Sequence, residues 1–402
     1  MAVLMGAWHA IRRNAETSRQ EATKRRAREF GEDLVVNLRK LQSRLEAGYV
    51  FAKAHGATPP KAGGKPGKRP LVVAPLEDRI VQRALLDVLQ DADDLPLLQA
   101  VLACPTSVGG IRGRGVDTGL KLFQARVEAG DQYCAGSDIA AFFTKIPRQK
   151  VFEFLTGAGV EIEFVELVEK ALTVELANED RLSAADRKLF PTGPDGVAQG
   201  CPLSALAGNI VLREFDARMN ERGITCIRYI DDFIVLGRSE RGVRKAMTSA
   251  GEMLAAYGMS IYDPVRAPTK AFEGKIGEPH TFLGHELCPG SFPPAAGARE
   301  RLMSQIGTLI AEGQRSIDKA GSGRALQSQD RCYAQTLVAI DNTVRGWRGS
   351  FRTSNCPDVF AAMDREIDRR LEGFHGYYRA RMAKMNRAQQ RQAMKVSLLL
   401  KT

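Results

Sequence analysis

The sequence predicts an α+β fold that ends in a helical region, and three observations support this prediction. Between residues 71 and 290, apolar runs of strand length alternate with amphipathic segments of helical spacing. From residue 296 onwards three or four helices are expected, with a linker at 321–329. The chain has 402 residues, 44% of them hydrophobic, which is enough for two or three packed subdomains. No apolar run reaches the roughly 18 residues that a membrane helix needs.

The expected elements follow one another simply along the chain. Residues 8–50 have helical spacing, and a loop rich in glycine, proline and lysine follows at 55–70. Further helices are expected at 76–94, 148–188, within 193–220 and at 239–259. Strands are expected at 71–75, at 132–138, on both arms of 226–237 and at 280–287. No internal repeat is evident.

The charge of the chain indicates the kind of partner that it binds, and its cysteine content indicates the compartment in which it works. The formal net charge is +11, and the stretch from residue 290 to the end holds 19 Lys/Arg against 10 Asp/Glu. A basic excess of this kind suits a polyanionic partner such as nucleic acid. The seven cysteines form no Cys-x-x-Cys pair, so we expect neither a disulfide framework nor a zinc site. A reducing cytoplasm fits this pattern.

The stretch RYIDDFIVLG, residues 228–237, places two carboxylates in the middle of an apolar run. Apolar arms around a two-residue centre predict a β-hairpin with Asp231 and Asp232 at its turn. Asp-Asp is a poor turn sequence, because the favoured hairpin turns require positive φ angles. Broken local rules are most expected at functional sites. A divalent cation would relieve the cost of burying two carboxylates, whereas the alternative is an exposed acidic turn.

A third acid, Asp138, also ends an apolar strand, in AGSDIAAFF. If both strands deliver their acids to one edge of a sheet, Asp138, Asp231 and Asp232 form a two-metal site. Such a site holds ions roughly 3.5–4 Å apart and serves phosphoryl transfer.

An ordered set of motifs resembles the reverse transcriptases of bacterial group II introns and of the related unknown-group, defence-associated lineage. YIDD resembles their Tyr-x-Asp-Asp box, SDIAAFFTKI the first palm motif and GVAQGCPLSALAGNIVLREFD the second. GMSIYDPVRAPTK and FLGHEL are similar to the later palm motif and the primer grip, and residues 67–89 and 109–123 to the finger motifs. The resemblance covers about residues 33–290. It implies a right-hand polymerase with fingers, a palm with an antiparallel sheet and a helical thumb.

The resemblance also implies roles for individual residues. Asp138, Asp231, Asp232 and the carbonyl of Ile139 would hold two Mg²⁺ ions, which Mn²⁺ could replace. Lys270, in competition with Lys275, would protonate the pyrophosphate. Phe143 would exclude a ribose 2′-hydroxyl. Further residues expected to bind dNTP are Lys68, Arg69, Arg79, Gln199 and Gly200, and residues expected to contact nucleic acid are Arg112, Arg114, Tyr229, Arg345, Arg348, Arg352 and Arg369. For the basic residues near 68–79 and for Phe143, a solvated loop and ordinary core packing remain the structural alternatives.

The implied domains are 1–130 (N-terminal helices and fingers), 131–290 (palm, with 148–195 partly fingers or insert) and 291–402 (thumb with a basic tail). Ala198 and Ala205 replace the usual prolines of the second palm motif, so its loop is expected to differ in shape. We expect Trp347 to anchor helix packing rather than to stack on a base.

The implied activity is RNA-directed DNA synthesis. Zinc-ligand and His-Asn-His endonuclease patterns are absent from the sequence, as are the Asn-Ala-x-x-His and Val-Thr-Gly signatures of retron enzymes. What remains resembles the enzymes of the unknown group, many of which act in antiphage defence. This resemblance implies a noncoding RNA as template and cDNA as product. Two alternatives stay open: a group II intron maturase that helps splicing, and a catalytically silent RNA-binding scaffold. The sequence does not specify the oligomeric state.

Overall fold

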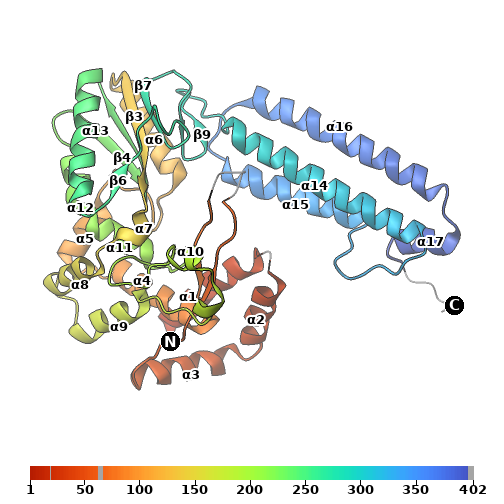
Figure 1. The fold of residues 1–402 in the computed structure, drawn as a ribbon, viewed down its shortest axis with the longest axis horizontal. Helices are drawn as coiled ribbons and strands as arrows, with labels where there is room; N and C mark the ends of the chain where they lie inside the picture. The colour runs from red at the N-terminus through yellow and green to blue at the C-terminus, as the bar shows by residue number, and fades with distance from the viewer. Residues whose placement is uncertain (19, 62–66, 397–402) are drawn as a thin grey trace. The chain divides into compact units, whose positions relative to one another are not determined.

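The computed structural model describes residues 1–18, 20–61 and 67–396, which form two compact units (Figure 1). The first unit is Met1–Ile276 and the second is Gly277–Thr402. Among the described residues, no helix combines the length and the apolar character required to cross a membrane.

The first unit begins with helices and a short two-stranded sheet. Its helices are α1 (Ala2–Glu16), α2 (Glu21–Glu32), α3 (Leu34–Glu46), α4 (Leu76–Gln90), α5 (Pro96–Ala103), α6 (Val116–Glu128), α7 (Phe142–Lys145), α8 (Arg148–Gly157), α9 (Ile162–Leu172), the 3₁₀ helix η2 (Glu179–Arg181), α10 (Ala184–Arg187), α11 (Ser204–Val211), α12 (Arg213–Arg218) and α13 (Glu240–Ala255). The antiparallel pair β1 (His55–Ala57) and β2 (Leu71–Val73) flanks the glycine-rich loop.

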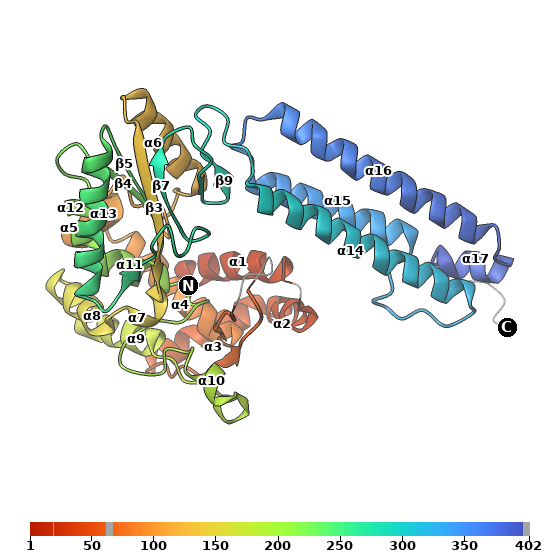
Figure 2. The same ribbon diagram turned by 45° about the horizontal axis from the view of Figure 1, so that its top comes forward.

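A five-stranded antiparallel sheet forms the centre of the first unit (Figure 2). Its strands are β3 (Tyr133–Ala140), β4 (Thr225–Tyr229), β5 (Asp232–Gly237), β6 (Ser260–Ile261) and β7 (Ala271–Lys275). The order is β4-β5-β3, with β6 and β7 both pairing with β3 on its other edge. In β5 the four residues from Phe233 to Leu236 are all fully buried, so both faces of this strand are covered.

Helices pack around this sheet for reasons that are visible in the sequence. α13 contacts β3 and β5, and it starts where the Ser239 side chain accepts a hydrogen bond from the backbone N–H of Gly242. Its buried residues Val243, Ala250 and Leu254 recur at helical spacing. α4 begins just after Pro75 and carries two acids in its first turn, which suits the positive end of the helix dipole.

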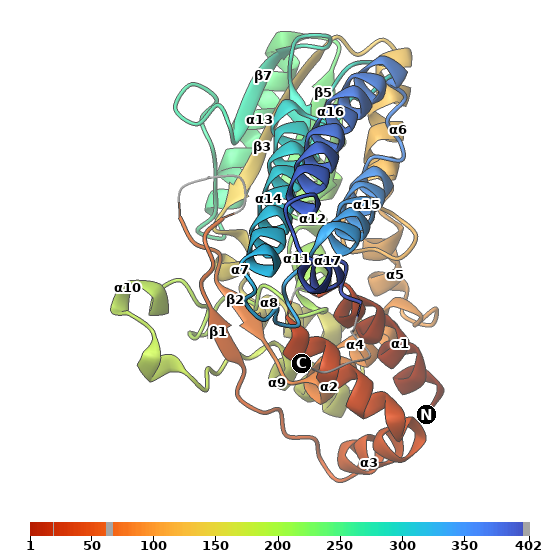
Figure 3. The same cartoon turned by 90° about the vertical axis from the view of Figure 1, so that its right-hand side faces the viewer.

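Within residues 277–396, the second unit holds two short strands and four helices. The strands β8 (Thr281–Phe282) and β9 (His285–Glu286) pair across a tight turn. The helices are α14 (Ala296–Gly321), α15 (Tyr333–Ser350), α16 (Pro357–Met382) and α17 (Arg387–Ala393). α14 packs against the other three, and Figure 3 shows α14, α15 and α16 running alongside one another. One apolar cluster joins these three helices through Leu302, Ile306, Ile340, Met363 and Ile367.

The predicted fold class is confirmed: an α+β unit with an antiparallel sheet precedes a helical unit. Two expected elements differ in detail. The helical region at 8–50 is divided among α1, α2 and α3. The region expected to be helical over 148–188 is divided between α8 and α9, and after Leu172 it holds only the short η2 and α10. The three-part domain division remains a prediction.

Candidate active site

The three predicted acids lie together where the β4–β5 hairpin turns. Asp138 on β3 faces Asp232 on β5 in antiparallel register. Asp231 lies in the turn, and its carbonyl accepts a hydrogen bond of 2.7 Å from the backbone N–H of Ile139. The hydrogen bonds of the sheet therefore fix two carboxylate positions on adjacent strands and a third beside them.

The turn itself differs from the prediction. Tyr229 pairs with Asp232, so the two turn residues are Ile230 and Asp231 and not the acid doublet. Of these two, only Ile230 has a positive φ, at 61°. Positive φ at the first central position is the pattern of a type II′ turn, where glycine is usual. A β-branched residue held there is strained by roughly 1–3 kcal/mol, so the surroundings must hold it in place.

Lys270 and burial set the electrostatics at the acids. The Lys270 ammonium forms an ion pair with the Asp138 carboxylate, and the Lys270 carbonyl accepts the backbone N–H of Asp138 at 3.0 Å. Burial raises the pKa of Asp231, while its own backbone N–H and the charges of Arg69 and Arg228 act in the opposite direction. A carboxylate with this cost of ionisation gains from a nearby cation.

The three acids are of the right chemical type to bind divalent metal ions, and the strand register brings their backbones together. Their side chains, however, are not arranged as a metal site. Within residues 1–18, 20–61 and 67–396, no three His, Cys, Asp or Glu side chains lie close enough together to hold a metal. At Asp138 the Lys270 ammonium already neutralises the carboxylate, as a metal would. Metal binding therefore requires that this ammonium move away from Asp138 and that the three carboxylates turn toward one another.

The three basic residues expected to hold the triphosphate lie in different surroundings. Lys68 is bound to Asp186, with its ammonium 2.7 and 2.8 Å from the two carboxylate oxygens. Arg69 is close enough to Asp231 for its charge to lower the pKa of that carboxyl. Burial lowers the pKa of Arg79, which lines a pocket described below.

Phe143 lies on the short helix α7, whereas Gln199 and Gly200 lie in the loop that precedes α11. Phe143 is half-buried and packs edge-on against Phe142, with 5.3 Å between ring centroids. Phe142 is the buried member of the pair, so Phe143 is the ring nearer solvent. The Gln199 carbonyl accepts the N–H of Val72 at 3.0 Å. At Gly200, φ is 121° and a Cβ would lie 2.8 Å from the Val72 carbonyl oxygen, so only glycine fits.

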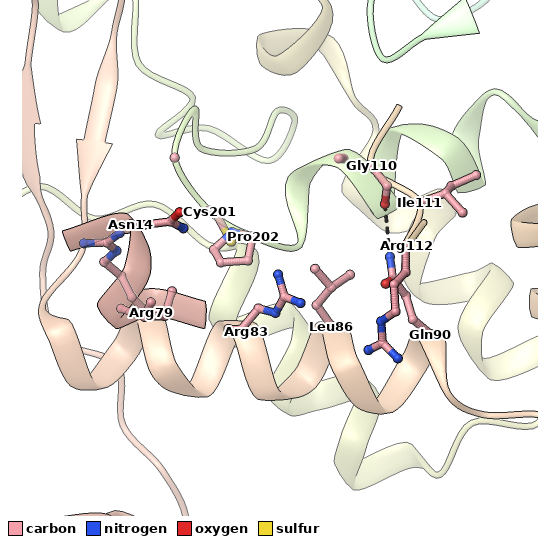
Figure 4. Close-up of a pocket in the computed structure, with 13 residues that line it drawn as sticks. Asn14, Arg79, Arg83, Leu86, Gln90, Gly110, Ile111, Arg112, Cys201 and Pro202 are labelled. Carbon is pink, nitrogen blue, oxygen red and sulfur yellow. Dashed lines mark hydrogen bonds between the residues drawn. The ribbon is translucent and has the colours of Figure 1, made fainter. Parts of the chain in front are cut away.

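A pocket of about 410 Å³ lies beside Gly200 and was not predicted from the sequence (Figure 4). Arg79, Arg83, Leu86 and Gln90 rise from one face of α4, because their spacing matches the helical repeat. Gln90 donates a hydrogen bond of 3.0 Å to the carbonyl of Gly110, in the loop that closes the pocket. The remaining walls come from α1, the loop around residue 111, the loop at 200–202 and the start of α11.

Arg112, Arg114 and Tyr229 were predicted to contact nucleic acid, and the structure separates them. Arg112 lines the same pocket at its rim and pairs with Asp87 and Asp91. Arg114 instead donates to the backbone carbonyls of Ala103, Cys104 and Ser107. Its guanidinium therefore stabilises the 103–107 segment. Tyr229 ends β4 opposite Asp232.

The arginines predicted in the second unit lie on α15, on α16 and in the segment between them. Arg345 and Arg369 are 77% and 69% exposed and pair with Asp341 and Glu366 of their own helices. Arg348 donates to the carbonyl of Phe351 at 2.8 Å, and Arg352 is exposed. Trp347 packs against the rings of Phe351 and Phe360, in agreement with its predicted packing role.

The prediction missed one element of the site, a buried ion pair between Arg228 and Asp216. Arg228 is fully buried and immediately precedes Tyr229. Burial opposes its charge, but Asp216 more than offsets this effect and keeps the pKa of Arg228 above its ordinary value. A lone arginine inside an apolar strand, CIRYI, was the signal that could have revealed it.

Comparison with known proteins identifies a matching family model and two curated relatives. The family model described as "Reverse transcriptase (RNA-dependent DNA polymerase)" matches residues 59–264. "Protein YkfC" of Escherichia coli K12 is 27% identical over 194 residues, which are 47% of each chain. The "Uncharacterized 91 kDa protein in cob intron" of Schizosaccharomyces pombe is 28% identical over 177 residues, 44% of this chain and 20% of that protein. The chain thus spans less than half the length of these two curated relatives.

Two solved structures have a weaker likeness. The "Partial Cas6-RT-Cas1--Cas2 complex" matches with a TM-score of 0.34 and 21% identity over 64% of this chain and 42% of that chain. A structure of telomerase from Candida albicans with a fragment of telomeric RNA matches with a TM-score of 0.41 and 12% identity, over 84% and 59% of the two chains.

Proposed function

The chain belongs to the reverse transcriptase family, and we propose that it is an RNA-directed DNA polymerase that makes cDNA by nucleotidyl transfer at Asp138, Asp231 and Asp232. Its fold is that of a right-hand polymerase. The observation that carries the proposal is the strand register. The pairing of β3 with β5, together with the β4–β5 hairpin, brings three acids from two distant motifs to one end of the sheet.

In this proposal the three carboxylates and the Ile139 carbonyl hold two Mg²⁺ ions, or Mn²⁺ in their place. When bound, these ions supply charge neutralisation for the attacking and leaving oxygens of the transfer. The protein's own part is to fix the backbone that carries these acids before substrate arrives, which the β3–β5 ladder supports. Lys270, placed beside Asp138, is the residue proposed to give a proton to the departing pyrophosphate.

The neighbouring residues supply binding and selection in this proposal. Arg69 and Arg79 contact the triphosphate, because guanidinium groups pair well with phosphate oxygens. Phe143 rejects a ribose 2′-hydroxyl by steric clash. Gly200 permits close backbone approach to the nascent base pair. Lys68 and Arg114 are weaker candidates, because Asp186 and backbone carbonyls already occupy their charged groups.

The pocket on α4 suits the template strand. Arg79 gives it positive charge, whereas Arg83 and Arg112 are paired with Asp87 and Asp91. Gly110 and Gly200 place the pocket next to the loops near the acids. Phosphate contacts of this type position a nucleic acid without reading its sequence. The exposed arginines of α15 and α16 would contact the RNA–DNA duplex in the same way.

The template proposed here is a noncoding RNA, and the biological role proposed is antiphage defence in a bacterial cytoplasm. Support for the role comes from the sequence resemblance to unknown-group enzymes, not from the geometry. A second candidate is an intron maturase, which the relative named for a cob intron favours. Sequencing RNA and cDNA that co-purify with the protein separates the two: intron RNA without cDNA favours the maturase.

Primer extension tests the activity itself. The protein is incubated with an RNA template, an annealed DNA primer, dNTPs and Mg²⁺, beside the Asp231→Asn variant. Extension by the unaltered protein that the variant lacks is expected. Absence of extension with DNA or RNA primers, in a protein that still binds RNA, would favour the silent RNA-binding scaffold.

A further inference from the structure

A buried polar network lies directly behind the turn that carries Asp231. Arg228 on β4 is fully buried, and its Nε and Nη2 atoms donate to the two carboxylate oxygens of Asp216 on α12, at 2.7 and 2.5 Å. Asp216 is only 4% exposed. Burying such a pair carries a large desolvation cost, so a buried ion pair is weak support for stability. The presence of this ion pair therefore has to be explained by something other than stability.

The remaining donors of Arg228 reach the turn and the loop that packs on it. Nη1 donates to the carbonyl of Ile230 at 2.9 Å, and Nη2 donates to the hydroxyl of Ser107 at 2.9 Å. The backbone of Arg228 is also tied to this loop, because its N–H donates to Thr106 and its carbonyl accepts from Val108. One planar side chain thus joins α12, the 106–110 loop and the turn.

The turn needs such support. Ile230 has a left-handed backbone, which a β-branched residue rarely adopts. The loop packs closely against it, since a Cβ at Gly109 would lie 2.6 Å from the Ile230 nitrogen. Asn209 on α11 fixes the position of this loop, because its side-chain amide donates to the Gly109 carbonyl at 3.0 Å.

We propose that Arg228 is a positioning residue that holds the Ile230 peptide in its strained conformation and thereby aims Asp231 and Asp232. It acts through the turn and touches neither substrate nor metal. This inference rests on the proposed polymerase function for its effect on catalysis, but its effect on the turn is independent of that function.

The test replaces the whole ion pair, so that no unpaired charge is left buried. In the double variant Arg228→Met/Asp216→Leu, apolar residues of similar size replace both partners, an exchange that is often tolerated. Arg228→Lys is the second variant, since it keeps the charge but cannot make all four contacts. The matched control is Arg126→Met/Asp131→Leu, which removes an ion pair in the same unit whose Asp131 is 3% exposed.

Two measurements are made well below the melting temperature of each variant. Both Arg228 variants should lower kcat for primer extension by about 100-fold, with the KM for dNTP changed less than about twofold, because misplaced catalytic groups slow the chemical step. Hydrogen–deuterium exchange should accelerate in peptides that cover residues 229–233. The control should change neither quantity, whatever its melting temperature.

The outcomes separate the two ideas. If the unaltered protein extends no primer, but exchange at 229–233 still accelerates only in the Arg228 variants, the polymerase function fails and the positioning role stands. If the protein extends primers and the Arg228 variants match the control in kcat and in exchange, Arg228 is a structural residue only and the inference is overturned.

Discussion

Asp138 and Asp232 face each other across β3 and β5, in the register position next to the β4–β5 turn. Paired positions on antiparallel strands lie within about 4.5–5.5 Å of each other. Two like charges at that distance destabilise the sheet unless a cation lies between or beside them. Here the Lys270 ammonium neutralises Asp138, so the sheet tolerates the pair without metal.

We expect Asp232→Asn to abolish primer extension while the fold is kept. Removal of one of three carboxylates should slow the reaction by at least about 1,000-fold, on the order of 4 kcal/mol in the barrier. Steady-state extension assays measure this loss, and thermal unfolding confirms the fold. Glu252→Gln, at an exposed position of α13, is the control and should leave the rate unchanged. A rate loss below tenfold for Asp232→Asn would contradict the assignment.

The sequence was a good guide to the fold because its patterns are local. Strand-length apolar runs and amphipathic segments identified β3, β4, β5 and α13 without any long-range information. The meeting of Asp138 with Asp232 depends on strand order and register. It was therefore reached through the family resemblance and the pairing argument together, not through spacing alone.

The details that sequence reasoning missed all depend on tertiary context. The turn was placed one residue too late, because local rules disfavour Ile230 at positive φ. The loop at Gly109 and the Arg228 side chain contact this turn, and a single sequence does not reveal those contacts. The partners of Lys68 and Arg114 are Asp186 and the 103–107 carbonyls, which a single sequence does not reveal. The sequence therefore assigned these two charged side chains to substrate, although other groups of the protein already pair with them.

Lys68 and Arg69 should differ in their importance for dNTP binding. Lys68 is paired with Asp186, whereas Arg69 lies near enough to Asp231 to affect its pKa. We expect Arg69→Ala to raise the KM for dNTP by about tenfold or more, the loss of one charge-assisted contact. Lys68→Ala should change it by less than about twofold. Single-nucleotide incorporation over a range of dNTP concentrations gives both values, and a larger effect at Lys68 would reverse their roles.

Phe143 should determine sugar selection. Phe143→Val removes the ring proposed to clash with a 2′-hydroxyl, so the preference for dNTP over rNTP should fall by about 10- to 100-fold, or roughly 1.4–2.8 kcal/mol. The measurement is the ratio of kcat/KM for dGTP and GTP.

The neighbouring Phe142 provides the contrast for this experiment. It is 2% exposed and packs in the core, so Phe142→Leu should lower the melting temperature and leave the sugar preference intact. An equal change in preference from both variants would show that Phe143 acts through packing rather than through the clash.

In the second unit, His285 should make stability depend on pH. His285 is 1% exposed, its Nδ1–H donates to the Leu283 carbonyl at 3.1 Å, and its ring centroid lies 4.9 Å from that of Phe351. Burial lowers the pKa of His285 below its ordinary 6.5, although the Leu283 carbonyl acts in the opposite direction. The unfolded chain therefore takes up a proton at higher pH than the folded one, and stability is lost as pH falls from 6.5 through the lowered pKa.

His285→Phe removes this titration and should flatten the profile in that window. Trp347, which contacts Phe351, reports on the second unit when Trp8 in the first is replaced by Phe in all proteins compared. Urea unfolding followed by Trp347 fluorescence between pH 5 and pH 8 should show the stability of the His285 protein falling toward pH 5 relative to the variant. Above pH 7 the difference between the two should be constant, because neither protein titrates at this position there. Parallel profiles across the whole range would mean that His285 accepts its proton without cost in the folded state.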